Sequence, residues 1–485
     1  MHEVNVKRRG GNRLEDSKNN GSITLLVLVF SGIMVMLLGG VSGFLFAQNR
    51  LQTKKADKEL AMQIAEAGVD YYRWFLSHYP DDLTDKTGVS PGPYEHEYLD
   101  PQGSAIGKFS LQINGNSQCG TLRSVDISST GWTYDDPAIK RKVSVRYSRP
   151  SVAEYAYIID DNVWAGSDRQ IKGKYHSNGG IRMDGENDSL VTSAKETWNC
   201  TSSFGCDPTE EKPGVFGAGS GFDLWSFPVE PIDFTGITVD LAEMKQAAKD
   251  YGIYIPPSGS RGYHAIFKSD GTVDIYKVTR VNDIRSYSSE DGWHWSPEYI
   301  SRESFYNNYP VPSDCSLIFI EDDLWVGGTV EGKVSIASAD LINPSGTTDV
   351  WLQGNITYNH SDGSDGLLVV GENSVRIPLY SPDNMELKGI FVAQKGHFGR
   401  NYYTESGRYR VPSYLRSYVK RNLLKITGSI ISKGRVGTKW TSGGVFVSGY
   451  ENRENSYDRE LMSDPPPMTP FADDEYTFIK WEEVN

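Results

Sequence analysis

The longest apolar stretch of the chain lies near its N-terminus, where Ser22 to Ala47 contain no charged side chain. Fifteen of these 26 residues are Leu, Ile, Val or Phe. As a helix rising about 1.5 Å per residue, the stretch would be roughly 39 Å long, and a bilayer core needs only about 20 such residues. A cleaved signal peptide has a shorter apolar region followed by a small-residue cleavage site. The pattern therefore predicts a transmembrane helix over 22–47.

A helical pattern of a different kind continues through 48–80 without an intervening proline before Pro80. Apolar or small residues recur there at steps of three and one, the period of one helix face. They are Ala61, Ile64, Ala65, Gly68, Val69, Tyr72, Phe75 and Leu76. We expect one helix from about 22 to 78, half in lipid and half above it. The small residues Ala61, Ala65 and Gly68 would let another element pack closely on this stripe.

Beyond residue 80 the pattern changes to the two-residue alternation that is typical of β-strands. Within 81–150, three alternating segments at 107–114, 121–128 and 141–148 are separated by turn residues. This arrangement predicts a small antiparallel sheet. Its apolar face could be buried on the helical stripe described above.

The rest of the chain is also predicted to be mainly β. Region 151–315 is irregular and β-rich, with a short helix near 240–251. In 316–449, short β-type runs broken by Gly, Asn or Asp begin at irregular intervals, which favours a parallel β-helix or solenoid. A β-sandwich is the main alternative. Region 450–485 is predicted to be a polar tail with a proline-rich linker.

Charge separates the N-terminus from the rest of the chain. The formal net charge is −14, whereas residues 1–21 carry five Lys or Arg and three acids, so the remainder carries about −16. An acidic body argues against nucleic acid as a partner. The basic leader, 1–21, favours a cytoplasmic N-terminus by the positive-inside rule, although four basic residues also follow the span. We expect a single-pass protein of the cytoplasmic membrane with a periplasmic or extracellular body.

The chain has four cysteines. Cys200 and Cys206 lie close together in a short polar segment, and we expect them to pair in an oxidising compartment. Two free thiols are the alternative. The pairing of Cys119 and Cys315 is left open by the sequence. No Cys-x-x-Cys pair is present, which argues against a zinc ribbon or a thioredoxin-type site.

Motifs for catalysis are incomplete. His176 and Ser177 lie in a His-Ser-Asn-Gly-Gly stretch without the G-x-S-x-G elbow that exposes a nucleophile. A near match to a phosphate loop at 327–334 ends in valine, where the magnesium-binding hydroxyl is required. We therefore expect no catalytic residues, no metal site and no cofactor. The aromatic group at 293–295 could bind sugar, but packing in a core or loop is the commoner role.

Several segments carry a resemblance to a known family. A basic leader ending at Gly21, an apolar span from Ser22, and Ala-Glu-Ala-Gly at 65–68 together resemble type IV pilus minor pilins and pseudopilins of the PilX-like kind. The later β-rich runs resemble the β-helical part of large pilin-like proteins. The resemblance implies that a prepilin peptidase cuts between Gly21 and Ser22 and that the new N-terminus is methylated. Leu26 replaces the Glu found at the fifth mature position of most pilins, a departure shared by some tip-forming minor members.

The resemblance implies a structural part of a type IV pilus or a type II secretion-like machine, and not an enzyme. Its N-terminal helix would pack against other pilin-like subunits, and Gly39 and Gly43 form a small-xxx-small pattern that permits close helix contact. The body would serve assembly, adhesion or surface display. The alternative is a membrane-tethered protein that binds or acts on a surface polysaccharide. An enzyme of that kind requires paired carboxylates in one groove.

Overall fold

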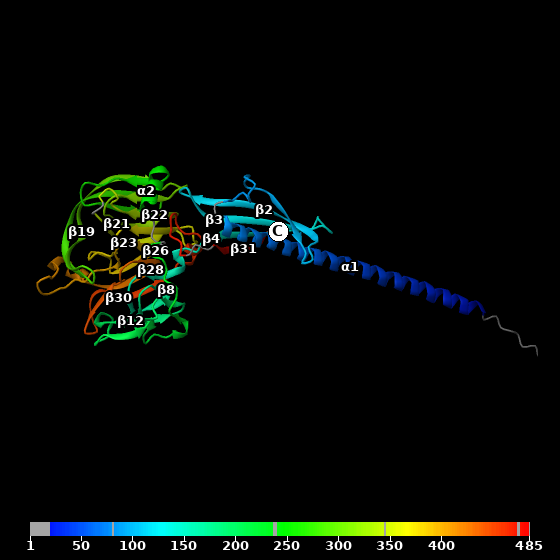
Figure 1. The fold of residues 1–485 in the computed structure, drawn as a ribbon, viewed down its shortest axis with the longest axis horizontal. Coiled ribbons are helices and arrows are strands. Elements are labelled where there is room, and N and C mark those ends of the chain that lie inside the picture. The colour runs from blue at the N-terminus through cyan, green and yellow to red at the C-terminus, as the bar shows by residue number, and fades with distance from the viewer. Residues whose placement is uncertain (1–19, 80–81, 236–239, 344–345, 473–475, 485) are drawn as a thin grey trace, which may run out of the picture.

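In a computed structural model, the chain forms a long N-terminal helix, a small antiparallel sheet on the end of that helix, and a larger β body (Figure 1). The structure describes residues 20–79, 82–235, 240–343, 346–472 and 476–484. The predicted leader therefore lies outside the described residues, except for its last two positions. The prediction of a mainly β chain with a long N-terminal helix is confirmed.

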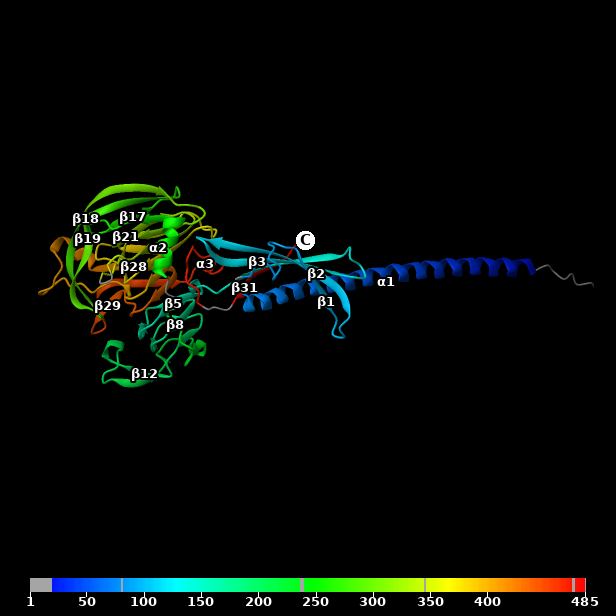
Figure 2. The ribbon, with the colours of Figure 1, turned by 45° about the horizontal axis from the view of Figure 1, so that its top comes forward.

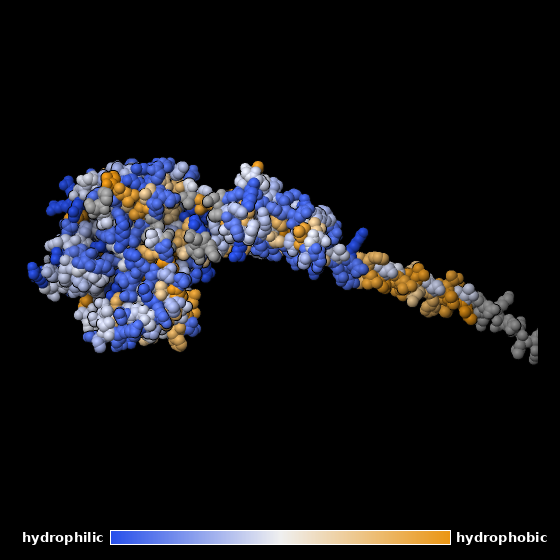
Figure 3. All heavy atoms as spheres, viewed as in Figure 1, coloured by the Kyte–Doolittle hydropathy of each residue, from blue (hydrophilic) through white to orange (hydrophobic). Residues whose placement is uncertain are grey.

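Helix α1 runs from Asn20 to His78 without a break. Proline is absent from it, and the many Leu, Ala and Met residues favour the helical conformation. Residues 23–56 are exposed, and Figure 3 shows the outer part of this helix as an apolar rod projecting from an otherwise mostly polar molecule. Among the described residues, α1 is the one helix long and apolar enough to cross a membrane. It is therefore a candidate membrane span.

Five antiparallel strands form the sheet that packs on α1. In spatial order they are β1 (Tyr94–Leu99), β2 (Ala105–Gln118), β3 (Thr121–Thr133), β4 (Lys140–Ser148) and β31 (Thr477–Val484). Buried and less buried positions alternate along β4, as the pleat of a strand requires. The buried side chains form one core with Tyr72 and Phe75 of α1. The sheet therefore depends on the helix for its hydrophobic cover.

The β body is built from strands that stack in parallel. One row contains, in spatial order, β16 (Ile253–Ile255), β20 (Leu317–Ile320), β22 (Lys333–Ser338), β24 (Gly366–Gly371), β26 (Asn384–Ala393), β28 (Lys420–Ser432), β5 (Tyr155–Ile159), β8 (Lys174–Ser177), β11 (Val191–Ser193) and β15 (Trp225–Ser226). Each strand pairs in parallel with the next strand of this row. The row therefore runs through the whole body.

Further parallel rows lie beside the first. One contains β17 (Tyr263–Phe267), β21 (Leu324–Val330), β23 (Val350–Tyr358), β25 (Val375–Arg376) and β27 (Phe398–Gly399). Another contains β6 (Val163–Ala165), β9 (Ile181–Met183) and β14 (Val215–Phe216). A third contains β30 (Val445–Ser456), β7 (Gln170–Lys172) and β10 (Glu186–Asn187). Apolar side chains from all these rows enclose one core.

The remaining elements are additions to this stack of parallel strands. The antiparallel strands are β12 (Thr197–Cys200) with β13 (Glu210–Pro213), β18 (Thr272–Ser288) with β19 (Gly292–Pro310), and β29 (Lys439–Ser442) with β30. The helices are α2 (Leu241–Asp250) and α3 (Arg459–Ser463), and the 3-10 turns are η1 (Val152–Glu154), η2 (Ser202–Phe204), η3 (Phe222–Leu224) and η4 (Ser413–Tyr418). The side chain of Asp240 caps α2 by accepting from the amides of Ala242 and Glu243.

Some strands are apolar at every position because both of their faces are buried. All four residues of β20 are buried. Ile318 and Ile320 point into the core shared by the rows, whereas Leu317 and Phe319 belong to a second core. Helix α2 and residues near the C-terminus cover that second core, and Figure 2 shows α2 against the outside of the stack. Strands covered on two faces become continuously hydrophobic.

One predicted boundary does not separate two units in the structure. The boundary at 315/316 falls inside the stack, because β16 pairs with β20 on its far side. The later half also closes onto the earlier half, since residues 430–432 of β28 pair with residues 157–159 of β5. Pairing of this kind satisfies the backbone groups of a strand edge that would otherwise be exposed. Regions 151–315 and 316–449 therefore form one body.

The predicted polar tail, 450–485, is also part of the fold. Residues 466–470, which include three prolines, are buried, and the hydroxyl of Ser335 donates to the carbonyl of Pro467. The chain then returns to the first sheet as β31, beside β4. Apolar side chains such as Leu461 and Met468 hold this segment against the second core. The segment is a packed connection and not a free linker.

A buried carboxyl group gives the body a pH dependence. Burial, together with the nearby Asp349 and Asp322, raises the pKa of Asp323 to about 7. The unfolded chain releases this proton near the ordinary pKa, so the contribution of Asp323 to stability is full below about pH 4 and is lost as pH rises to 7. We expect Asp323→Asn to raise the melting temperature at pH 8 but not at pH 4, because each pKa unit is worth about 1.4 kcal/mol.

The substitution keeps an oxygen that can accept from the backbone amide of Asp349, as Asp323 does at 3.0 Å. The measurement is the difference in melting temperature between variant and parent across pH 4–8. Comparing the two proteins at each pH cancels the titration of groups that do not interact with Asp323. A difference that stays constant with pH would contradict the assignment to Asp323.

Candidate functional site

The two halves of α1 meet different surroundings. Around Gly39 and Gly43 no atom lies within 4 Å of where a Cβ would be, so this face of the helix is open to another partner. The predicted cleavage point, Gly21 and Ser22, falls in the first turn of α1. The predicted packing stripe is turned toward the sheet, and Ala61 and Ala65 are fully buried. Helix α1 thus has an exposed apolar N-terminal part and a C-terminal part that is packed against the sheet.

The buried half of α1 touches the sheet through glycines. A Cβ at Gly68 would lie 2.8 Å from the ring of Phe109 in β2, so a larger side chain does not fit there. The reverse contact is closer still. A Cβ at Gly131 in β3 would lie 2.9 Å from the carbonyl carbon of Ile64 and nearer yet to backbone atoms of Ala61 and Ala65. Glycine inside a strand marks such close approaches of two backbones.

A buried carboxylate fastens the loop after α1 to both the helix and the sheet. Asp85 accepts from the hydroxyl of Tyr71 on α1 at 2.9 Å and lies 2.6 Å from Nε2 of His96 on β1. Burial and the hydrogen bond to Asp85 raise the pKa of Tyr71 to about 12. The tyrosine therefore stays a donor at all physiological pH values. The group therefore ties α1, the loop after it and β1 together.

A disulfide joins the small sheet to the β body. Cys119 lies in the turn between β2 and β3, and Cys315 lies just before β20, 196 residues further along the chain. The main chain also passes between the two units after β4 and again before β31. Cross-links of this kind restrict the unfolded chain and hold the two units together. The sequence did not reveal this pair, because no local pattern indicates that two residues 196 positions apart lie together.

Basic and aromatic side chains fill the junction beside this disulfide. Arg123 of β3 donates to the carbonyl of Thr469 at 2.9 Å, and its guanidinium carbon lies 4.8 Å from the ring centroid of Phe471. Arg149 lies 4.0 Å from the same centroid. Burial, helped by Arg149, lowers the pKa of Arg123 to about 10, so it remains charged at neutral pH. These contacts attach the C-terminal segment to the sheet.

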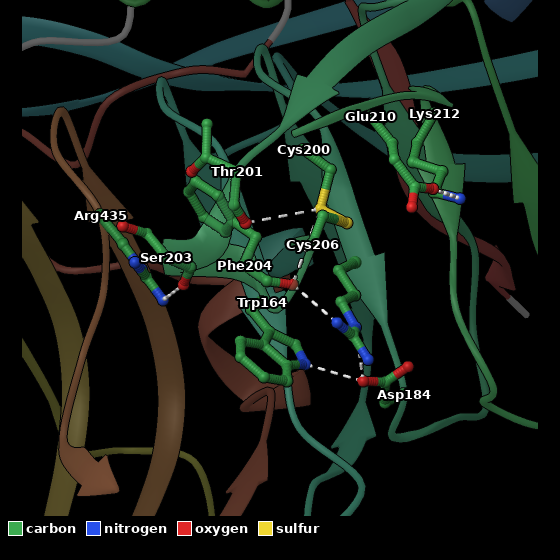
Figure 4. The surroundings of a disulfide bond; sticks show 11 residues. Trp164, Asp184, Cys200, Thr201, Ser203, Phe204, Cys206, Glu210, Lys212 and Arg435 are labelled. Carbon is green, nitrogen blue, oxygen red and sulfur yellow. Dashed lines mark hydrogen bonds and ion pairs between the residues drawn. A yellow bond between two sulfur atoms is a disulfide. The ribbon is translucent and has the colours of Figure 1, made fainter. Parts of the chain in front are cut away.

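The second disulfide joins Cys200 to Cys206 (Figure 4). It closes a short loop after β12, and Arg435 reaches this loop by donating to the carbonyl of Ser203 at 3.2 Å. Phe204 packs edge-on against Trp198, with ring centroids 5.2 Å apart. The bond therefore holds a loop against the body and has no free thiol nearby that could exchange with it in the described residues.

The residues considered for catalysis are placed in structural roles. His176 is buried in β8, where its ring nitrogens lie 2.8 Å from the hydroxyl of Thr192 and 2.9 Å from the side-chain oxygen of Asn178. Burial lowers the pKa of His176. The hydroxyl of Ser177 donates instead to the carbonyl of Asp161 at 2.6 Å. The histidine and serine therefore do not form a proton relay.

The other candidate motifs also lack the geometry that their chemistry requires. Val334 lies in β22 with strands on both sides, unlike the strand-to-helix turn of a phosphate loop. Within the described part of the chain, no three His, Cys, Asp or Glu side chains gather as a metal site would require. Trp293 packs on Tyr409 with centroids 4.6 Å apart, whereas Trp295 is 65% exposed.

Comparison with known proteins adds only a distant structural similarity. No protein-family model and no curated protein sequence matches the chain. Among solved structures, the competence-associated pilin ComZ from Thermus thermophilus is similar to it, with 13% sequence identity and a TM-score of 0.28. The similarity covers 88% of this chain and 97% of that chain. With so low a TM-score, the function has to be inferred from this chain's own elements.

Proposed function

We propose that the chain is a membrane-anchored, minor pilin-like or pseudopilin-like assembly subunit that carries a β-solenoid outside the cytoplasmic membrane. The observation that carries this proposal is α1 itself. Its first half is an exposed apolar rod, and its second half is the hydrophobic cover of an antiparallel sheet. A helix built this way can leave the bilayer and enter a bundle of like helices without disturbing the sheet.

The energetics support a membrane or filament environment for the rod. Fifteen Leu, Ile, Val or Phe residues in 22–47 favour insertion by roughly 6 kcal/mol at about −0.4 kcal/mol each. In water that surface would remain exposed along the whole rod. The open face around Gly39 and Gly43 fits close packing with a neighbouring helix. Other pilin-like subunits are the proposed partners.

The two disulfides support a body in an oxidising compartment, since cytosolic thiols are kept reduced. With the basic leader, this supports a cytoplasmic N-terminus and an extracytoplasmic body. The parallel rows of the body support the solenoid interpretation, in which each coil buries its apolar face by stacking on the next. In this proposal the body is a structural and display element and not an enzyme.

The proposal is tested by the mass and N-terminal sequence of the protein from membranes that contain its prepilin peptidase. We expect a chain that begins at methylated Ser22. We further expect Gly39→Leu with Gly43→Leu to lower incorporation into the assembled complex several-fold, while Gly354→Ala in the body has no effect. An intact leader together with normal incorporation of the double variant would contradict the proposal, leaving a simple membrane-tethered β protein.

A further inference from the structure

A groove lined by basic and aromatic side chains lies beside the hairpin of β18 and β19. Its walls include three arginines and two aromatic side chains, and its volume is about 500 Å³. They are Arg285, Trp295, Arg408, Tyr409 and Arg410. We call it the arginine groove. No role in membrane anchoring or subunit assembly requires it, because it lies on the body and not on α1.

The fold fixes the shape of this groove. Arg285 and Trp295 are direct partners across the two strands of the hairpin. The guanidinium carbon of Arg285 lies 5.7 Å from the ring centroid of Trp295 and 5.2 Å from that of Tyr409. The loop that carries Tyr409 is held to β18 by two backbone hydrogen bonds between Tyr287 and Tyr402, at 3.1 and 2.9 Å. The groove is thus present in the chain without a ligand.

Positive charge in the groove is not neutralised by the protein. In the part of the chain that the structure describes, Arg285, Arg408 and Arg410 form no ion pair with a carboxylate, and the buried Nε of Arg285 has no hydrogen-bond acceptor. The acidic residue of the groove, Asp283, pairs with Arg261 at 2.9 Å. Guanidinium groups bind carboxylates through two parallel hydrogen bonds, so these side chains fit one carboxylate-bearing ligand.

The aromatic wall limits which anion fits. Trp295 exposes 65% of its surface, although a ring of this size is usually covered or used for binding. An indole face attracts the apolar C–H face of a sugar ring, whose hydrogens carry partial positive charge. A volume of about 500 Å³ lies within the usual range for small-ligand sites. The net charge of −14 disfavours a long polyanion that would extend beyond the groove.

From this geometry we infer that the arginine groove binds a short oligosaccharide whose sugar carries a carboxylate. Trp295 would stack on the ring, and Arg408 and Arg410 would hold the carboxylate, with Arg285 supporting both. This inference does not rest on the assembly role proposed above. In an extracytoplasmic body, such a groove would bind a short acidic glycan and not a long acidic polymer.

The test uses the full-length protein in detergent and measures binding of trigalacturonate by isothermal titration calorimetry. Its fully methyl-esterified form is the matched probe, because the rings are the same and the charge is removed. We expect saturable binding of the acid, at least tenfold tighter than that of the ester. Arg408→Ala with Arg410→Ala should remove this tenfold preference, and Trp295→Ala should weaken binding of both probes at least tenfold.

Arg302→Ala is the control, because Arg302 is exposed on the same hairpin but does not line the groove. It should bind like the parent, and the melting temperatures of all variants should match the parent's. The inference would be overturned by equal affinity for acid and ester, by absence of saturation at millimolar trigalacturonate, or by an unaffected Trp295→Ala variant. Tighter binding of a ten-nucleotide oligothymidylate than of trigalacturonate would overturn it in favour of nucleic acid.

Discussion

Replacing Gly131 by alanine is expected to detach α1 from the sheet. The added Cβ would meet backbone atoms of Ala61, Ile64 and Ala65, and backbone cannot rotate away as a side chain can. Overpacking of a core costs roughly 1–3 kcal/mol, and we expect a value of about 3 kcal/mol or more here. The melting temperature should fall, and hydrogen exchange of the amides at 61–76 should accelerate.

The matched control is Gly354→Ala, because a Cβ at Gly354 has no atom within 4 Å. Neither glycine has a positive φ, so the two substitutions differ in available space and not in backbone strain. The control should behave like the parent. If Gly131→Ala also kept the parent's melting temperature and exchange rates, the tight helix–sheet contact would be refuted. The result bears on the proposed function, since this contact attaches the helix that carries the apolar rod to the sheet.

Removal of the Cys119–Cys315 disulfide is also expected to have a large effect on stability. This bond closes a loop with a sequence separation of 196 residues, and the chain-entropy relation assigns about 5 kcal/mol to such a loop. We expect Cys119→Ser with Cys315→Ser to lower the free energy of unfolding by a few kcal/mol. Hydrogen exchange should accelerate at the β2–β3 turn and near residue 315, where the two units are joined.

Cys200→Ser with Cys206→Ser provides an internal comparison. That bond spans a sequence separation of only 6, for which the same relation gives about 2 kcal/mol. Its loss should affect the loop at 201–206 and leave the junction unchanged. Equal destabilisation by the two double variants would show that the long-range bond does not hold the sheet to the body.

Local patterns were enough to predict the elements around α1. The apolar run at 22–47 and the stripe ending at Leu76 have the helical period, and both properties belong to the segment itself. Alternation at 107–114, 121–128 and 141–148 likewise indicated strands that bury one face. Gly131 could have been singled out as well, since a glycine within a strand pattern signals a close backbone approach.

Other features depend on segments that are distant along the chain. The pairing of β28 with β5, the return of β31 to the first sheet and the Cys119–Cys315 bond each join residues more than a hundred positions apart. The arginine groove is of the same kind, because Arg285 and Tyr409 come from different elements. The local period of hydrophobic residues does not indicate which strand pairs with which.

The sequence by itself determined the apolar rod, its continuation as one helix and the β character of the remainder, because these follow from hydrophobicity and period within a segment. Only the tertiary structure showed that the body is a single stack and that the C-terminal segment packs on both the body and the first sheet. It also showed where arginines without a carboxylate partner lie together. The physical reason is that strand pairing, disulfide choice and grouping of charges depend on distances between segments. Those distances are set when the whole molecule pairs its backbone hydrogen-bonding groups and buries its apolar faces at the same time.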